Sequence, residues 1–428
     1  MAQVAFFLDN KRISKVDFSN PLSGNPGSGA TEFMTVLVCF SLAMRKRDTV
    51  LLVTEPGIFP KTVKVILVDD VYAAIEWSEK QQAILVIRSY LNEMNKITSR
   101  IKLQGKVRIV IWAHLTPSPK DLRDMASVSQ IVKIVCLENN QRVRIIDNKI
   151  HCKAVTIPYP VVGNTNKRDL TKLSYNIVYM GALVPQKGFH FLADVWPKIN
   201  KKNPQARLIV LGSADLYDTH LLLGRNKIAS EQYELRIFRN LDIHDPSVAF
   251  LGNVNVEARD AVLESALLGI VNPSGLTETF CSSAVEFQQR GIPVVGARKF
   301  GLLDTVLHRK TGYLVMHPHL LSSQILKLSK NKEKNYKLGD CARKTVMAKY
   351  KMETVLSRWE NLIEHIATNQ SMPLMPESRK VEIKSLQAVT GLLNRRFVNF
   401  FFPLWPTQVE LWIKVKRLLK FLFSFKKY

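Results

Sequence analysis

The sequence predicts an α/β protein with two doubly wound domains and a basic amphipathic tail. Three observations support this prediction. Short, almost continuously apolar runs alternate with longer segments of helical periodicity. This alternation stops near residue 160 and restarts near residue 176, and from residue 371 the composition becomes basic and aromatic. At about 150 residues per domain, a chain of 428 residues has room for two domains and a tail.

The first predicted domain spans residues 1–160. Its apolar runs are nearly continuous, which is typical of strands in a parallel sheet covered on both faces. Residues 31–45 place Phe33, Leu37 and Phe40 near helical spacing, so a helix is expected after the first strand. The predicted strands are Val4–Leu8, Val50–Val53, Ala83–Ile87, Arg108–Trp112 and Ile131–Leu137.

The second predicted domain spans residues 176–345, after a polar linker at 161–175. Ligands of doubly wound sheets bind beyond the carboxyl ends of the strands, so two such domains predict a cleft between them. Residues 346–370 are expected to form a helix that packs back toward the first domain. The predicted strands of the second domain begin at Asn176, Arg207, Val248, Leu268, Ile292 and Gly312.

Residues 371–428 form the predicted tail, which contains 11 Lys and Arg against 3 Asp and Glu, a net charge of +8. Leu411, Val415, Leu418 and Leu422 recur at helical spacing among basic residues, which indicates an amphipathic helix. We expect this helix to bind an anionic membrane surface; the alternative is packing on the protein body or on a partner.

The whole chain has a net charge of +25, which attracts phosphates of nucleic acid, lipid or a nucleotide. No nucleic-acid-binding module is recognisable, so no nucleic-acid partner is expected. We find no signal peptide and no uncharged apolar stretch of about 18 residues, and the five cysteines are widely spaced. These features predict a cytoplasmic protein, peripheral on the inner face of the plasma membrane.

A glycine-rich segment, Gly24-Asn-Pro-Gly-Ser-Gly-Ala-Thr, precedes the first predicted helix. It is not a P-loop, because Ala30 stands where the lysine is required. Gly27 and Gly29 would let a ligand approach the backbone and the helix N-terminus, although a tight strand-to-helix turn explains them equally well. The sequence contains no Asp-x-Asp and no Cys-x-x-Cys, so neither a metal site nor a cofactor is expected.

The second domain contains a stronger candidate site. Lys187 follows Gly181, at a predicted strand end, and precedes a predicted helix. Glu278 lies in a predicted loop, and Glu286 is expected about two turns into the helix that follows it. Carboxylates accept hydrogen bonds from sugar hydroxyls, whereas a lysine and helix N-terminal N–H groups bind phosphate. This combination predicts a nucleotide-sugar site, in which the N–H groups would be those of Phe280, Cys281, Ser282 and Ser283.

Residues 176–316 resemble the donor domain of the GT-B fold retaining glycosyltransferases of the group 1, or family 4, class. The matching elements occur in the same order and spacing; they are Gly181…Lys187-Gly188, Leu211-Gly-Ser, Phe250-Leu-Gly-Asn, Asn272-Pro-Ser, Glu278-x7-Glu286, Gly291-Ile-Pro-Val-Val and Thr311-Gly-Tyr-Leu-Val. The first half resembles the acceptor domain more weakly, through the glycine-rich loop and Trp112-Ala-His114. The resemblance implies a GT-B fold, in which two Rossmann-like domains face a cleft.

The resemblance also implies roles for single residues. Glu286 would bind the ribose hydroxyls, Glu278 would hold the transferred sugar, and Lys187 would neutralise the diphosphate. Backbone N–H groups at Phe280, Cys281 and Ser282 would contact sugar and phosphate, and Gly27 and Gly29 would let their loop close over the diphosphate. His114 matches a histidine that contacts the sugar near the reacting centre; a structural histidine is the alternative.

One position departs from the resemblance. The family usually carries an arginine directly after the glycine of the first donor motif, and here that residue is Ala182. Loss of a charge-assisted hydrogen bond costs about 1.5–3 kcal/mol. Arg225 is a candidate replacement.

The resemblance implies a hexosyltransferase-type enzyme that acts without metal and with retention of configuration. It would move a sugar from a nucleoside-diphosphate sugar. The basic, aromatic tail indicates the acceptor, which is expected to be a glycan or a lipid-linked precursor of lipopolysaccharide or capsule on the cytoplasmic face. The alternative, favoured by Ala182, is a non-catalytic relative that binds a sugar nucleotide or a partner protein.

Overall fold

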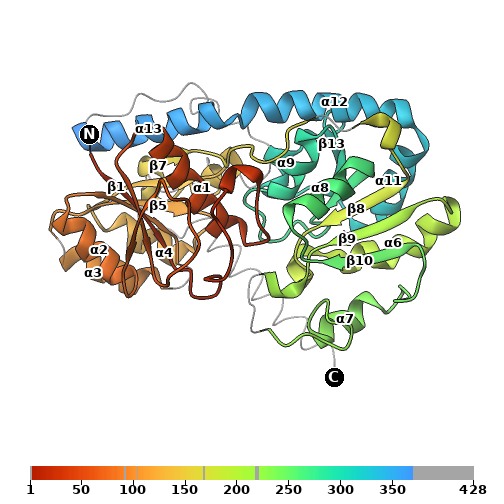
Figure 1. Ribbon diagram of the computed structural model, residues 1–428, viewed down its shortest axis with the longest axis horizontal. Helices are drawn as coiled ribbons and strands as arrows, with labels where there is room; N and C mark the ends of the chain where they lie inside the picture. Colours follow the sequence, from red (N-terminus) through yellow and green to blue (C-terminus); the bar gives the residue numbers. More distant parts are fainter. Residues whose placement is uncertain (1, 91–92, 104, 167–168, 217–220, 370–428) are drawn as a thin grey trace.

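The computed structural model describes residues 2–369, except 91–92, 104, 167–168 and 217–220. The predicted tail, residues 371–428, therefore lies outside the described residues. In the described part, two α/β domains lie side by side, and each is built on one parallel sheet (Figure 1).

The first domain has a seven-stranded sheet of order β3-β2-β1-β4-β5-β6-β7. All five strands expected from the sequence are present, and two short strands, β3 and β7, are added at the sheet edges. Its strands are β1 (Val4–Leu8), β2 (Thr49–Val53), β3 (Lys64–Leu67), β4 (Ile84–Arg88), β5 (Arg108–Ala113), β6 (Ile131–Cys136) and β7 (Ala154–Thr156), and its helices are α1 (Ala30–Met44), α2 (Val71–Lys80), α3 (Met94–Leu103), α4 (Pro119–Ala126) and α5 (Asn139–Val143).

The second domain has a six-stranded sheet of order β10-β9-β8-β11-β12-β13. Each of its strands corresponds to one expected from the sequence. They are β8 (Asn176–Met180), β9 (Arg207–Leu211), β10 (Val248–Gly252), β11 (Ala266–Val271), β12 (Val294–Ala297) and β13 (Gly312–Val315), and the helices are α6 (Phe189–Lys202), α7 (Glu231–Ile237), α8 (Val256–Ser265), α9 (Ser282–Gln289), α10 (Leu302–Thr305), α11 (Leu321–Lys330) and α12 (Lys332–Lys349).

Each sheet has a buried core on both faces, which explains the nearly continuous apolar strands. In β1, Val4, Phe6 and Leu8 belong to one core, and the alternating residues Ala5 and Phe7 belong to the other. Successive side chains of a strand point to opposite faces, so a strand covered on both sides must be apolar throughout.

Helix α13 (Met352–Thr368) returns the chain to the first domain. Trp359 packs against Phe6 and Trp112, at ring-centroid distances of 5.8 and 4.8 Å. Arg45, the C-cap residue of α1, forms an ion pair of 2.9 Å with Glu360. Helices α12 and α13 together run along one side of both domains (Figure 1). The single helix expected at 346–370 is divided, because α12 ends at Lys349 and α13 begins at Met352.

Candidate functional site

A cavity of about 190 Å³ lies between the two domains, at the carboxyl ends of the strands of the second sheet. Loops that follow β8, β9, β10 and β11 line one side, and the glycine-rich loop before α1 lines the other. Both sheets have the doubly wound order, in which neighbouring loops diverge at the strand where the direction of winding reverses. The cavity therefore occupies the place where such folds bind ligands.

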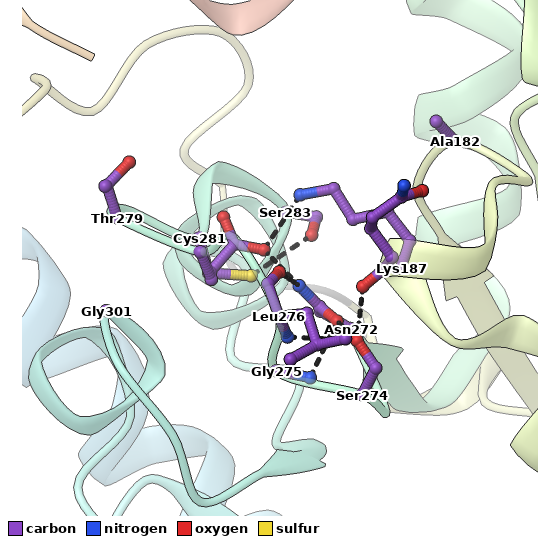
Figure 2. Close-up of polar contacts among 12 residues, drawn as sticks. Ala182, Lys187, Asn272, Ser274, Gly275, Leu276, Thr279, Cys281, Ser283 and Gly301 are labelled. Carbon is purple, nitrogen blue, oxygen red and sulfur yellow. Dashed lines mark hydrogen bonds and ion pairs between the residues drawn. The ribbon is translucent and has the colours of Figure 1, made fainter. Parts of the chain in front are cut away.

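Lys187, Glu278 and Asn272 form a hydrogen-bonded group in this cavity. The Lys187 Nζ lies 2.9 Å from Glu278 Oε2, and Asn272 Nδ2 donates to the same oxygen at 2.7 Å. Figure 2 shows the Lys187 side chain extending toward the loop that follows β11. Sequence reasoning gave Lys187 and Glu278 separate partners in the ligand, whereas the structure also pairs them with each other.

Close packing between two loops holds this group in place. Gly188 follows Lys187 with φ of +72°, and a Cβ there would lie 2.5 Å from the backbone nitrogen of Ser274. Only glycine fits both the left-handed conformation and the contact. The Ser274 hydroxyl in turn donates to the Gln186 carbonyl. The turn carrying Lys187 is thus tied directly to the loop carrying Asn272.

Helix α9 begins at the cavity, as the sequence predicted. Phe280, Cys281 and Ser282 line the cavity. The Ser282 N–H was expected to contact the ligand, but it already donates to the Phe280 carbonyl at 3.1 Å. Burial raises the pKa of the Cys281 thiol to about 12, so this side chain is a neutral thiol. Glu286 is the fifth residue of α9, just over one turn from its start rather than two.

Glu286 forms a second ion pair in the cavity, with Arg259 of α8. Arg259 Nη1 lies 3.4 Å from Glu286 Oε2 and also donates to the Asn25 carbonyl of the first domain, at 3.3 Å. Burial raises the pKa of Glu286, while the Arg259 charge opposes this effect and the Asp260 carboxylate adds to it. Sequence reasoning missed Arg259, which belongs to no recognisable motif. Asn25 lies in the glycine-rich segment, but its contact with Arg259 joins residues far apart in the chain, so the sequence did not reveal it.

The glycine-rich loop contributes Asn25, Gly27, Ser28 and Ala30 to the cavity wall. Gly29 is the N-cap residue of α1 and does not line the cavity. The Asn25 side chain organises the loop, since its Oδ1 accepts hydrogen bonds from the N–H groups of Gly27 and Ser28. The loop therefore has a defined shape where it faces the second domain.

His114 is buried beside the cavity but does not line it. Its Nδ1 is hydrogen-bonded to the Tyr159 hydroxyl, and its backbone carbonyl accepts a hydrogen bond from Thr279 Oγ1 of the second domain. Burial, assisted by the Arg88 charge, lowers the pKa of His114 to about 3. The imidazole is accordingly neutral near pH 7, and the proposed contact with sugar stays a prediction.

Ala182 and Arg225 do not supply a phosphate-binding cation in this arrangement. Ala182 lines the cavity with a fully buried methyl group. Figure 2 shows it apart from the hydrogen-bonded group of Lys187 and Asn272. Arg225 is exposed in a loop and does not line the cavity, so the structure does not support it as a replacement. In the described ranges, no group of three or more His, Cys, Asp or Glu is placed to hold a metal ion.

Comparisons with known proteins show which family model and which folds this chain is similar to. Residues 165–345 match the family model described as "Glycosyl transferases group 1". Sucrose-phosphate synthase from Thermosynechococcus elongatus superimposes with a TM-score of 0.67 at 14% identity, covering 86% of this chain and 100% of that chain. Alr3699/HepE from Anabaena, solved in complex with UDP and glucose, gives a TM-score of 0.64 at 15% identity over 86% and 100% of the two chains.

The chain has the GT-B fold. Within this GT-B architecture, the part matching group 1 includes every residue of the two ion pairs in the cavity. The glycine-rich loop belongs to the other GT-B domain, which lies outside the matched range.

Curated relatives are similar over part of the chain. A lipopolysaccharide 1,2-N-acetylglucosaminetransferase of Salmonella typhimurium is 25% identical over 192 residues, which are 44% of this chain and 48% of that protein. The capsular polysaccharide biosynthesis glycosyltransferase CapM of Staphylococcus aureus is 26% identical over 196 residues, 44% and 45% of the two chains. The chain thus spans about half the length of these relatives.

None of the described helices is long and apolar enough to cross a membrane.

Proposed function

We propose that this protein is a glycosyltransferase that moves a sugar from a nucleoside-diphosphate sugar to an acceptor hydroxyl. One observation supports the proposal above all: Lys187, Glu278 and Glu286 line one cavity at the start of α9, opposite a glycine-rich loop. The group 1 match over residues 165–345 and the UDP and glucose named for the solved Alr3699/HepE structure support the same chemistry.

The residues divide the work in the proposed reaction. The bond between the anomeric carbon and the diphosphate oxygen breaks, and its electron pair leaves with the diphosphate. The acceptor oxygen forms the new bond to the anomeric carbon, and its proton passes to an oxygen of the departing diphosphate. Lys187 and the N-terminus of α9 stabilise the charge that develops on the diphosphate. Both contacts of Glu278 with Lys187 and Asn272 use Oε2, which leaves the lone pairs of Oε1 to accept from a sugar hydroxyl.

Several finer features belong to the proposal. Transfer proceeds with retention and without a metal ion, and the acceptor is a glycan or a lipid-linked polysaccharide precursor at the cytoplasmic membrane face. The names of the Salmonella and Staphylococcus relatives are consistent with such an acceptor. For the membrane face, the argument is the basic and aromatic sequence of residues 397–428. Deletion of those residues should release the protein from anionic liposomes, and unchanged co-sedimentation would contradict this part.

A direct experiment tests the reaction. Purified protein is screened for thermal stabilisation by UDP, GDP, ADP, CDP and TDP sugars, since a ligand that binds the native state raises the melting temperature. The donor that binds is then assayed for sugar transfer, with Glu278→Gln as the matched variant. Transfer that is lost in this variant supports the proposal. Nucleotide binding without transfer to any acceptor, in a protein with Ala182 in the cavity wall, would favour the non-catalytic alternative.

A further inference from the structure

Arg259 is a largely buried cation in the cavity that the proposed function has not used. Its side chain is 12% exposed and lines the same cavity as Lys187. In the described part of the chain, the cavity wall contains two cations, Lys187 and Arg259, and two carboxylates, Glu278 and Glu286. Without a ligand, the two carboxylates balance the two cations. A diphosphate carries more than one negative charge, so we expect it to interact with both cations.

The contacts of Arg259 leave part of its hydrogen-bonding capacity unused. Its distance of 3.4 Å to Glu286 exceeds the usual 2.7–2.9 Å of a charge-assisted hydrogen bond. Its Nε is buried without a hydrogen-bond partner, and the Asp260 carboxylate lies 3.6 Å from it. A guanidinium has five N–H donors in a planar fork that matches phosphate oxygens. Arg259 can thus accept an anionic ligand without breaking an ideal ion pair.

The glycine-rich loop makes room for the guanidinium. A Cβ on Gly24 would lie 2.7 Å from Arg259 Nη2, and Gly24 has φ of +124°, which disfavours any side chain. The adjacent Asn25 carbonyl accepts the hydrogen bond from Arg259 Nη1. The guanidinium thus bridges the two domains at the loop that faces the cavity.

The position next to Glu286 indicates which part of a nucleotide Arg259 meets. In the proposed function, Glu286 accepts hydrogen bonds from the ribose hydroxyls. The charged group of the ligand nearest to Arg259 is then the phosphate bonded to that ribose. We propose that Arg259 binds the ribose-side phosphate of the donor and, through Asn25, holds the glycine-rich loop against the bound phosphate. This inference rests on the proposed function and extends it to a residue outside the recognised motifs.

Calorimetric binding of three related ligands tests the assignment. The nucleoside diphosphate that binds best, its monophosphate and its nucleoside are titrated into wild type, Arg259→Gln and Arg259→Lys. We expect Arg259→Gln to weaken both phosphorylated ligands by about 10- to 100-fold and the nucleoside by less than threefold. Arg259→Lys keeps the positive charge but lacks the planar guanidinium. Its affinity for the phosphorylated ligands should lie between those of wild type and Arg259→Gln. Arg239→Gln, at an exposed arginine outside the cavity, is the matched control and should bind all three ligands as wild type does.

Each other outcome overturns a specific claim. An equal loss for the nucleoside and the diphosphate would mean that Arg259 only orients Glu286 toward the ribose. Unchanged binding of the phosphorylated ligands in Arg259→Gln would show that Arg259 does not contact phosphate. If the wild-type protein binds no nucleoside diphosphate, the proposed function itself is wrong, and this inference fails with it. Melting temperatures of the variants, measured without ligand, show that each one is folded.

Discussion

Two cation–carboxylate pairs face the same cavity, but the protein holds them in different ways. Lys187 and Glu278 are 2.9 Å apart, and Asn272 of the same domain supports them. Arg259 and Glu286 are 3.4 Å apart, and Arg259 also reaches the Asn25 carbonyl of the other domain. The first pair is therefore organised by the second domain alone, whereas the second pair depends on how closely the first domain approaches. Motion of the domains should alter the second pair more than the first.

Replacing Lys187 should have the largest effect, because this cation is central to the first pair. In Lys187→Ala the diphosphate loses a charge partner and Glu278, 8% exposed, loses its counter-ion. We expect the transfer rate to fall at least about 100-fold, as it does when a donor to a developing charge is removed. Steady-state transfer measures this, with Lys198→Ala, an exposed lysine on α6, as the control. Transfer within threefold of wild type would mean that the first pair is not part of the site.

Glu286 provides a test of the second pair through pH. Burial raises its pKa above the ordinary 4.5, so the native state binds this proton more tightly than the unfolded state does. The stabilising effect of that proton is fully present below the ordinary pKa and is lost as pH rises through the raised one. Relative to Glu286→Gln, wild type should lose stability as pH rises through that window, by about 1.4 kcal/mol for each tenfold difference in proton affinity between the two states. Urea unfolding at pH 4.5 and 7.5 measures the difference; the same difference at both values would contradict the prediction.

Thr279 tests whether the first pair also senses the other domain. Its hydroxyl donates to the His114 carbonyl across the domain boundary, next to Glu278 in sequence. Thr279→Val removes this hydrogen bond, which contributes about 1 kcal/mol. We expect kcat/KM for the donor to fall about fivefold. The melting temperature of the free protein should change only slightly. A decrease as large as that of Lys187→Ala would show that the first pair is not independent of the first domain.

Tyr159→Phe should have the smallest effect. It removes the hydroxyl that contacts His114 Nδ1 and should cost about 0.5–1.5 kcal/mol of stability. Because the pKa of His114 is lowered from 6.5 to about 3, its protonation opposes folding only as pH falls through that interval. The pH profile of transfer between pH 5.5 and 8 should therefore be the same in wild type and variant. An acidic limb near pH 6.5 that shifts in Tyr159→Phe would show that His114 titrates in catalysis.

The strands show how far sequence patterns extend. Strands buried on both faces were predicted because their side chains are apolar at every position. Strands β3 and β7 were missed, since Lys64–Leu67 is mostly exposed and Ala154–Thr156 is half-buried. These edge strands exist because a neighbouring strand offers free hydrogen-bonding groups, which is a property of the assembled sheet.

The site divides in the same manner. Lys187, Glu278 and Glu286 could be found from the sequence, because a strand end and a helix start place them within one domain and in recognisable order. The role suggested for Arg225 could not be checked from sequence, and the structure places that residue away from the cavity.

The sequence by itself determined the two α/β domains and the residues that the second domain brings to its own strand ends. Only the tertiary structure decided that Arg259 meets Asn25, 234 residues away, and that His114 is buried against Tyr159 in a neutral state. The physical reason is that local periodicity and turn chemistry act within a few residues. Contacts across the cleft, and the burial that shifts a pKa, depend on how two separately folded sheets pack together.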